Sequence, residues 1–517
     1  MNKVPGFKKL KYLSAILSFF LVLAVPANSH QNDQGTKFDA HINISKNSTM
    51  IETEPAIAVD KNNTVHIAWT GFYVRTDAPD GVVSDIFYSN NKKGKFSKPK
   101  KIRVSEKWYS RSPTITVDSK GNAHIAFRRS ENQTNLLSED DIYYATNAKN
   151  NFKKPVLVVD GIFGFPKKNE VSAPYLPLIH CDSQDHICLT FLAWGFGSMF
   201  TDYYILFVIN EAGDWSDPQL AAQGNFVTDY QSILDQDDKL HFVFDDIAKG
   251  NNYGVFYTNN RNGEFFKPVK ASAEKHTLIN SPGIAVDSLG KAHIIYEYWG
   301  GSPGDPEIYY TNNANGEFNT WTPMQDSWVC YIPSIAVDAF DFIHIIYKRN
   351  PAYGGPLFYA NNFNGEFEVL KHDMTGNEWW YPGSCLFAMG NSPTLHISFY
   401  DFMDQSYDSD TEIFYLKGTC DTPAVPNPPK TLRAKPLLKD KIKLKWKDKS
   451  KDEDGFEIQR RKKENGTWIC IFKTKANAKS YVDEDPESKI SYQYRVRAFN
   501  SIGNSLYSNT AETKTRR

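Results

Sequence analysis

The 517-residue chain lacks the clustered motifs that hold metals and, after residue 25, the long apolar runs that cross membranes. It has six cysteines, and neither a CxxC nor an HxxxH motif occurs, so the sequence predicts no metal site and no cofactor. After Val25 no apolar run approaches the ~20 residues that a membrane span needs. Residues 30–423 carry 32 Lys and Arg against 48 Asp and Glu, and this acidic balance disfavours nucleic acid as a partner.

The N-terminus has the pattern of an export signal. Four lysines between Lys3 and Lys11 precede an apolar run from Tyr12 to Val25, and Ala27–Ser29 offers a small-residue cleavage site. We therefore expect residues 1–29 to be a signal peptide and the mature chain to be secreted, extracellular or periplasmic. No cysteine follows the apolar run, which argues against a lipid anchor there.

An exported chain can form disulfides, and the cysteine spacing offers two possibilities. Cys181 and Cys188 flank a short turn and would face each other across a hairpin, which predicts a bridge between them. Cys330 with Cys385 is a second possible pair, and Cys420 and Cys470 then stay free.

The middle of the chain is repetitive. The phrase at Pro55–Asp60 recurs at Pro113–Asp118, Pro282–Asp287 and Pro333–Asp338. A histidine then opens an apolar run in seven places 51 to 62 residues apart: His66, His124, His186, His241, His293, His344 and His396. Aromatic strands such as Ile86–Ser89 and turns such as Gly94–Phe96 complete each repeat. Four short strands per ~50 residues are typical of a propeller blade.

Seven histidine-led strands predict a seven-bladed β-propeller over residues 30–420, so the fold class is all-β. The seventh repeat lacks a fourth strand, because the chain runs from Ile413–Leu416 to Cys420 and a proline-rich linker. The segment Ala40–Ser45 is similar to the fourth-strand segment Lys101–Ser105. We expect this N-terminal strand to complete the seventh blade and so remove an exposed edge.

The turns Ser89–Phe96 and Thr311–Phe318 resemble a degenerate Asp-box of the BNR repeats found in sialidases, with Asn in place of Asp. The resemblance covers residues ~38–418 at the level of the repeat. It implies a propeller of the sialidase superfamily, in which an arginine cluster grips a carboxylate and a Tyr nucleophile acts with a Glu. The family's Arg-Ile-Pro motif is absent, although Tyr109–Pro113 lies in a loosely similar place, and sialidases have six blades.

Beyond the linker at 421–429, residues 430–517 resemble a fibronectin type III domain. The matching segments are Ile442–Trp446, Gly455–Arg460, Tyr492–Ala498 and Asn500–Gly503, in the order of that family. In secreted bacterial enzymes such modules mostly act as spacers, so we expect one here. Its excess of 23 Lys and Arg over 12 Asp and Glu is interpreted as a solvated strand face.

A histidine that occurs in every repeat belongs to the framework, so these histidines are not catalytic candidates. The fourth and fifth residues after each histidine vary, and they are expected at the face that carries the long, varied loops. The catalytic candidates at these positions are Arg128, Asp245, Glu297, Arg349 and Asp401. Residues expected to bind glycans, from the same positions and from the loops between repeats, are Arg111, Tyr230, His276, Tyr298, Trp299, Trp379 and Trp380.

Aromatic side chains beside paired charges are typical of sugar recognition. The sequence therefore favours a secreted protein that binds or processes extracellular glycans, as a sialidase-like glycoside hydrolase or as a polysaccharide lyase. Two carboxylates would serve hydrolysis, whereas His276, Tyr230 and Arg128 would serve a lyase. The alternative is a non-catalytic surface scaffold that binds a protein partner. No motif chooses between catalysis and binding.

Overall fold

The computed structural model describes most of the chain between residues 30 and 515. The described ranges are 30–31, 36–46, 50–75, 81–104, 109–130, 140–149, 151–161, 163–164, 171–195, 203–211, 213–247, 253–276, 278–300, 306–319, 321–324, 330–349, 357–363, 366–369, 385–389, 394–402, 411–420, 425–437, 441–463, 466–500 and 503–515. The predicted signal peptide lies outside them. Within these ranges every regular element is a β-strand, and none is a helix that spans a membrane.

The strands up to residue 420 form antiparallel sets whose members pair in chain order. Sets 1 to 3 are β4 (Ile51–Val59), β5 (Val65–Val74), β6 (Val82–Asn90) and β7 (Lys100–Ile102); β8 (Tyr109–Val117), β9 (Ala123–Ser130), β10 (Asp141–Thr146) and β11 (Val156–Val159); and β13 (Val171–Cys181), β14 (Ile187–Gly195), β15 (Tyr203–Glu211) and β17 (Gln219–Gly224). Two short strands, β12 (Phe163–Gly164) and β16 (Asp214–Trp215), add to set 3.

Sets 4 to 7 repeat the arrangement. They are β18 (Tyr230–Leu234), β19 (Leu240–Asp246), β20 (Gly254–Asn259) and β21 (Val269–Lys270); β22 (Ile279–Val286), β23 (Ala292–Tyr298), β24 (Glu307–Asn312) and β25 (Trp321–Pro323); β26 (Cys330–Val337), β27 (Ile343–Arg349), β28 (Leu357–Asn361) and β29 (Glu368–Val369); and β30 (Cys385–Met389), β31 (Thr394–Phe402) and β32 (Thr411–Cys420).

The sets close into a ring. Each set's first strand contacts the next first strand, in the order β4, β8, β13, β18, β22, β26, β30 and back to β4. Between every two neighbouring sets lies a cluster of buried apolar side chains. Radial sheets packed face to face around a closed circle are the architecture of a β-propeller.

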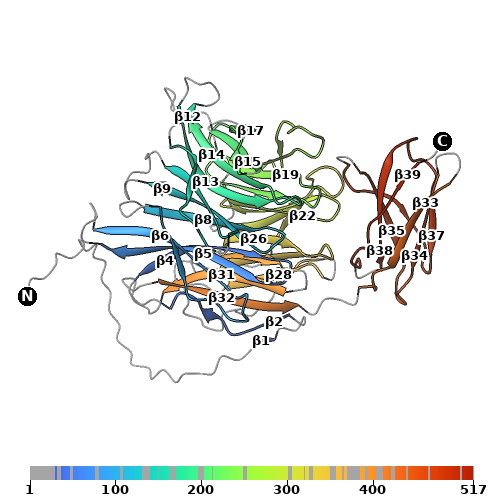
Figure 1. Ribbon diagram of the computed structural model, residues 1–517, viewed down its shortest axis with the longest axis horizontal. Coiled ribbons are helices and arrows are strands. Elements are labelled where there is room, and N and C mark those ends of the chain that lie inside the picture. The colour runs from blue at the N-terminus through green and yellow to red at the C-terminus, as the bar shows by residue number, and fades with distance from the viewer. Residues whose placement is uncertain are drawn as a thin grey trace, which may run out of the picture.

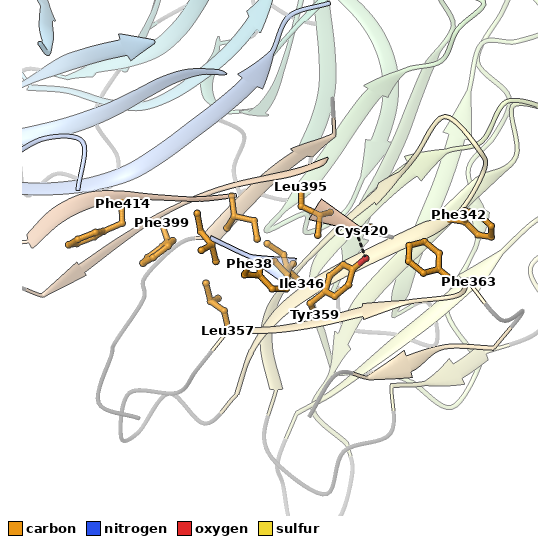
Figure 2. Packing of buried hydrophobic residues seen from close by; sticks show 12 residues of the cluster. Phe38, Phe342, Ile346, Leu357, Tyr359, Phe363, Leu395, Phe399, Phe414 and Cys420 are labelled. Carbon is orange, nitrogen blue, oxygen red and sulfur yellow. Dashed lines mark hydrogen bonds between the residues drawn. The ribbon is translucent and has the colours of Figure 1, made fainter. Parts of the chain in front are cut away.

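The N-terminal strands join the last set, as the sequence predicted. In β3 (Ile42–Asn43), Ile42 pairs with Tyr415 of β32, and in β2 (Thr36–Phe38), Phe38 pairs with Gly418. β1 (His30–Gln31) pairs with β2. Figure 1 shows these blue N-terminal strands beside the orange strands β31 and β32. Figure 2 shows Phe38 packed among side chains of sets 6 and 7, where Tyr359 contacts Cys420.

The recurring histidines are part of the framework. Six of them place Nδ1 2.6–2.7 Å from a third-strand tyrosine hydroxyl, in the pairs His66–Tyr88, His124–Tyr144, His241–Tyr257, His293–Tyr310, His344–Tyr359 and His396–Tyr415. The seventh, His186, instead lies 2.9 Å from Asp182 and is 40% exposed. Because the same contact repeats around the ring, it holds the sheets in place and marks no single reactive site.

Residues beyond 425 form a separate β-sandwich. One sheet pairs β33 (Lys430–Pro436), β34 (Ile442–Lys447) and β37 (Ser480–Asp483), and the other pairs β36 (Ile469–Lys473), β35 (Gly455–Lys462), β38 (Ser491–Phe499) and β39 (Ala511–Lys514). Their inner faces enclose a core that includes Trp446, Phe456 and Tyr494. In Figure 1 this sandwich lies to one side of the ring.

Three arginines join the sandwich directly to the ring. We expected a spacer module from the sequence and did not predict these contacts. Arg461 contacts Asp237 at 3.1 Å, and Arg495 donates to Gln236 at 2.8 Å. Arg497 donates to Asp341 at 2.6 Å. The three acceptors lie in the turns between first and second strands of sets 4 and 6, and Arg495 also donates to the carbonyl of Ser288 in set 5. These three arginines serve an intramolecular contact, whereas lysines such as Lys445 and Lys447 on β34 are exposed, in keeping with a solvated strand face.

The predicted bridge between Cys181 and Cys188 is wrong. Both thiols are free, because the register places Cys181 opposite Ile187 and Cys188 opposite His180. Adjacent positions in a strand pair point to opposite faces, so Cys181 packs against one apolar cluster and Cys188 lies in another. Cys420 and Cys470 are also free, as expected. The side chains of Cys330 and Cys385 lie outside the described residues.

Candidate functional site

A bulge in the first strand of several sets shapes the centre of the ring. The strand register shifts by one residue just before the recurring proline, as between Thr53 and Ala56 and between Arg111 and Thr114. The extra residue has a positive φ at four sites: Glu54 (54°), Ser112 (52°), Leu176 (48°) and Ser281 (49°). Positive φ is uncommon outside glycine, and bulges re-aim side chains near active sites. The residues around these bulges are therefore candidate site residues.

Two arginines of set 2 share one carboxylate. Arg128 forms an ion pair with Asp140, and Arg111 Nη2 lies 3.7 Å from the same carboxylate. Asp140 is buried, whereas both arginine side chains remain about one-fifth exposed, at 20% and 21%. The group carries one net positive charge, which suits an anionic ligand group. The neighbouring Arg129 is buried and donates to Tyr143 at 2.7 Å, so it belongs to the framework.

Two buried aspartates of set 4 hold a loop in place. Asp245 accepts hydrogen bonds from the amides of Thr228 and Asp229 at 2.7 and 2.9 Å, and from the Thr228 hydroxyl. Asp246 accepts from the amides of Asn225 and Phe226. Burial raises the pKa of Asp245 to about 6. Asp245, which the sequence suggested as catalytic, is thus engaged in ordering residues 225–229.

The loop that these aspartates hold presents Asp229 to the site. Asp229 is half-buried, and burial followed by the charges of Asp245 and Glu297 raises its pKa to about 7. Its Oδ1 accepts a hydrogen bond from the neighbouring amide of Tyr230 at 2.8 Å. A carboxyl group with a pKa near 7 is suited to proton transfer at neutral pH.

Tyr175 links the arginines to these carboxylates. Its hydroxyl donates to the carbonyl of Val227 at 3.1 Å. Burial raises the pKa of the phenol, with contributions from Tyr203, Asp245 and Asp229, while Arg128 lowers it. Tyr175 is therefore close to groups from sets 2 and 4 together, and its phenol stays protonated at neutral pH.

An aromatic pair lies beside Asp229. Tyr203 and Phe226 have ring centroids 5.3 Å apart, and Phe226 is 42% exposed. Phe226 is one of the two residues whose amides Asp246 holds, so the same loop carries the exposed ring and the proton-transfer carboxyl. An exposed aromatic face beside polar groups suits stacking against a sugar ring.

Glu297 and Asp401 are both buried, at 3% and 2% exposed. Glu297 accepts a hydrogen bond from Trp299 Nε1 at 3.3 Å and contributes to the pKa of Asp229. Asp401 lies opposite Glu412 in the strand register, on the other side of the ring. Arg349 is on β27 opposite Cys330, and its side chain lies outside the described residues. Of the five catalytic candidates, the structure brings Arg128, Asp245 and Glu297 toward one cluster.

Several residues expected to bind glycans lie in the interior. Tyr230 occupies the first-strand position of the recurring proline, which faces the interior. Its side chain is 1% exposed, and its hydroxyl donates to the carbonyl of Leu176 at 2.9 Å. His276 is fully buried, 2.9 Å from the Tyr296 hydroxyl and stacked on Tyr298 at 4.0 Å between centroids. Burial lowers the pKa of His276 to about 4. Neither side chain is open to a ligand, which corrects the expectation of exposed rings.

Tyr298 and Trp299 are half-buried at the end of set 5, so part of each ring remains accessible. Trp379 and Trp380 lie outside the described residues, and their expected binding role stays a prediction. The sequence reasoning missed Asp140, Tyr175 and Asp229. Tyr175 and Asp229 lie at or beside the first-strand bulge position, and the varied residues just before the recurring proline were the signal that could have found them.

Glu52 occupies the point where sets 1 and 7 meet. It is 1% exposed, accepts from Trp69 Nε1 at 2.8 Å, and its amide donates to the Thr411 hydroxyl at 2.9 Å. Burial raises its pKa to about 7. The folded state therefore keeps a proton that the unfolded chain releases above its ordinary pKa of 4.5.

We expect stability to fall as the pH rises from about 4.5 to about 7, because the folded protein binds the proton more tightly. Relative to Glu52→Gln, the wild type should lose up to ~3 kcal/mol of unfolding free energy across this window. Urea unfolding at several pH values measures the difference between the two proteins. A difference that stays constant with pH would contradict the assignment.

No family model matches the chain, and no curated protein matches it. Among solved structures, the polysaccharide lyase Uly1 has 11% identity and a TM-score of 0.48, with 74% of this chain and 99% of that chain covered. The α-L-arabinanase of Penicillium chrysogenum has 12% identity and a TM-score of 0.41, covering 73% and 98%. An Fn3-like protein from Clostridium thermocellum has 21% identity and a TM-score of 0.16, covering 18% of this chain and 95% of that one.

Proposed function

We propose that the ring is a seven-bladed β-propeller and that the C-terminal sandwich is a fibronectin type III domain of a secreted protein. Seven first strands in cyclic contact, with an apolar cluster between each two sets, support the blade count. The two-sheet sandwich and its core, on the segments that resemble the family, support the second assignment.

We further propose that the protein cleaves glycosidic bonds of extracellular glycans in the central site of the ring. The observation that carries this is Asp229, a half-buried carboxyl whose pKa burial and the nearby charges of Asp245 and Glu297 raise to about 7. Pairs of carboxyl groups whose pKa values are pushed apart supply the acid and its ionised partner in glycoside hydrolysis.

In this proposal Asp229 is the general acid that protonates the leaving oxygen, and Glu297 is the second carboxyl group of the pair. Glu297 is held by Trp299, and Asp245 positions the loop that carries Asp229. Arg111 and Arg128 bind an anionic substituent of the glycan. The two arginines carry two positive charges and Asp140 carries one negative charge, so the group has one net positive charge. Tyr203 and Phe226 supply the surface against which a sugar ring stacks.

We expect Arg128→Ala to lower kcat/KM about 100-fold on a carboxylated polysaccharide, since a bidentate, charge-assisted contact is lost. On a neutral polymer the loss should be much smaller. Arg433→Ala, which changes an exposed arginine of the C-terminal sandwich, is the matched control. Reducing-end release over a panel of neutral and acidic polysaccharides measures both, with thermal unfolding to confirm that each variant folds.

Polysaccharide lysis is a second candidate, favoured by the placement of Tyr175 close to Arg128. Elimination leaves an unsaturated sugar end that absorbs in the ultraviolet, whereas hydrolysis does not, so the products separate the two chemistries. A chain that binds glycans of the panel without releasing product would instead be the non-catalytic scaffold, and the catalytic proposal would be wrong.

A further inference from the structure

A cavity of about 670 Å³ lies where the ring closes, away from the central site. One wall is the N-terminal segment around β3, which pairs with β32, and the other is the turn at 91–99 that follows β6. Its charged lining residues are Lys46, Lys95, Lys98 and Lys417, with Asp39 as the single acid among them. We call this space the seam cavity. Its size falls in the range of small-molecule sites.

The charge of the seam cavity is local to this turn. Residues 91–103 contain seven Lys and Arg and no Asp or Glu, although residues 30–423 are acidic as a whole. The equivalent turns of sets 4, 5 and 6 read Gly-Glu-Phe and place Glu264, Glu317 and Glu366 where this turn has Lys95. The turn at the seam cavity therefore carries the opposite charge to the equivalent turns of these three sets.

Among the described residues, the lysines that line the seam cavity form no ion pair. Within the described part of the chain, the ion pairs of this region are those of Lys101 and Arg103 with Asp85, at 3.1 and 3.3 Å. Lys95 and Lys98 are exposed and take part in none of them. Lys417 is half-buried on β32, directly across the seam. Four positive charges around one enclosed space favour an anionic occupant.

The cavity also has an apolar wall. Phe96 and Tyr415 pack edge to face with centroids 5.0 Å apart, and both line the space. Sugar rings present apolar C–H faces together with polar substituents, so an aromatic wall and lysines together match an acidic saccharide. A fully hydrated inorganic anion needs no such wall. A nucleic acid would also have to approach the acidic surface of the ring.

We propose that the seam cavity is a second, non-catalytic binding site for an acidic polysaccharide, a polymer bearing sulfate or carboxylate groups. It lies on the rim, between the N-terminal strand and the first set, whereas the proposed catalytic groups come from sets 2 to 5. The site therefore holds the polymer to the protein independently of its cleavage, and it does not depend on the proposed hydrolase activity.

The test measures binding of the mature full chain to heparin, polygalacturonate, dextran and single-stranded DNA by titration calorimetry. The double substitution Lys95→Glu/Lys98→Glu should weaken heparin or polygalacturonate binding about tenfold and reduce the salt dependence of that binding. At position 95 it introduces the glutamate that the turns of sets 4, 5 and 6 carry. Lys149→Glu/Lys154→Glu changes two exposed lysines of the corresponding turn in set 2 and should alter binding less than about twofold. The readout is binding rather than product release, so a failure of the catalytic proposal leaves this one standing.

Hydrogen exchange with and without heparin locates the site, with protection expected at residues 36–46 and 91–99. Three results would overturn the proposal: no binding of either acidic polymer by the wild type, an equal loss in the control variant, or tighter binding of DNA than of the polysaccharides. Unchanged binding by the Lys95→Glu/Lys98→Glu variant, with its thermal unfolding intact, would do the same.

Discussion

Asp229→Asn is expected to lower kcat by about 100-fold or more, because it removes the proton donor while leaving the loop in place. The amide of Asn can still accept the hydrogen bond that Tyr230 donates to Asp229 Oδ1 at 2.8 Å. The wild-type carboxyl has a pKa of about 7 and must be protonated to act as an acid, so activity should decline as the pH rises through 7. The variant's residual activity should lack this decline. Rates of product release between pH 5 and 9 measure both effects.

Asp214→Asn is the control for this experiment, because Asp214 is exposed on the short strand β16 of set 3. It should keep the full rate and the decline above neutral pH. Wild-type activity that instead rises through pH 7 would show that Asp229 acts as a base, and an unaffected Asp229→Asn rate would remove it from the mechanism altogether.

Arg497→Ala is expected to cost ~3–5 kcal/mol of unfolding free energy, because it breaks a buried ion-pair network. Arg497 is 1% exposed and contacts Glu457 of its own sandwich at 3.1 Å and Asp341 of the ring at 2.6 Å. Its removal leaves the buried Glu457 with less compensation. We also expect the two domains to unfold in separate calorimetric transitions, since the arginine's contact with Asp341 of the ring is lost.

Lys462→Ala is the matched control on the neighbouring strand β35, where an exposed lysine pairs with Glu487 at 2.7 Å, and it should leave the unfolding free energy nearly unchanged. Asp341→Ala separates the two contacts of Arg497, because it cuts only the link to the ring. If Asp341→Ala leaves the two domains unfolding together, the arginine anchors do not couple them.

The repeat made the propeller predictable from sequence. Recurring residues predicted the strand order and the framework role of the histidines. The absence of a fourth strand after Leu416 predicted that the N-terminal strand pairs with the last set. The disulfide failed because it depends on strand register, and a shift of one residue sends Cys181 and Cys188 to opposite faces.

The site was less predictable, because what matters there departs from the repeat. Counting positions from the histidines located Arg128, Asp245 and Glu297. It did not show that the Asp245 carboxylate is already hydrogen-bonded to the loop at residues 228–229. Tyr230 and His276 were expected at the surface, yet packing decides whether a loop aromatic faces solvent or its neighbours. Asp229 owes its raised pKa to burial and nearby charges, which are properties of the assembled ring.

The pairing of the first strands with β32 also constrains the order of folding. Ile42 contacts Tyr415, so that contact cannot form until almost the entire ring segment has been synthesised. Contacts of such large sequence separation are slow to form, since loop closure must precede them. Until then the strand edges of sets 1 and 7 stay open to pairing with other chains. Ring closure therefore cannot precede the synthesis of β32, and we expect it to follow the pairing of strands within the individual sets.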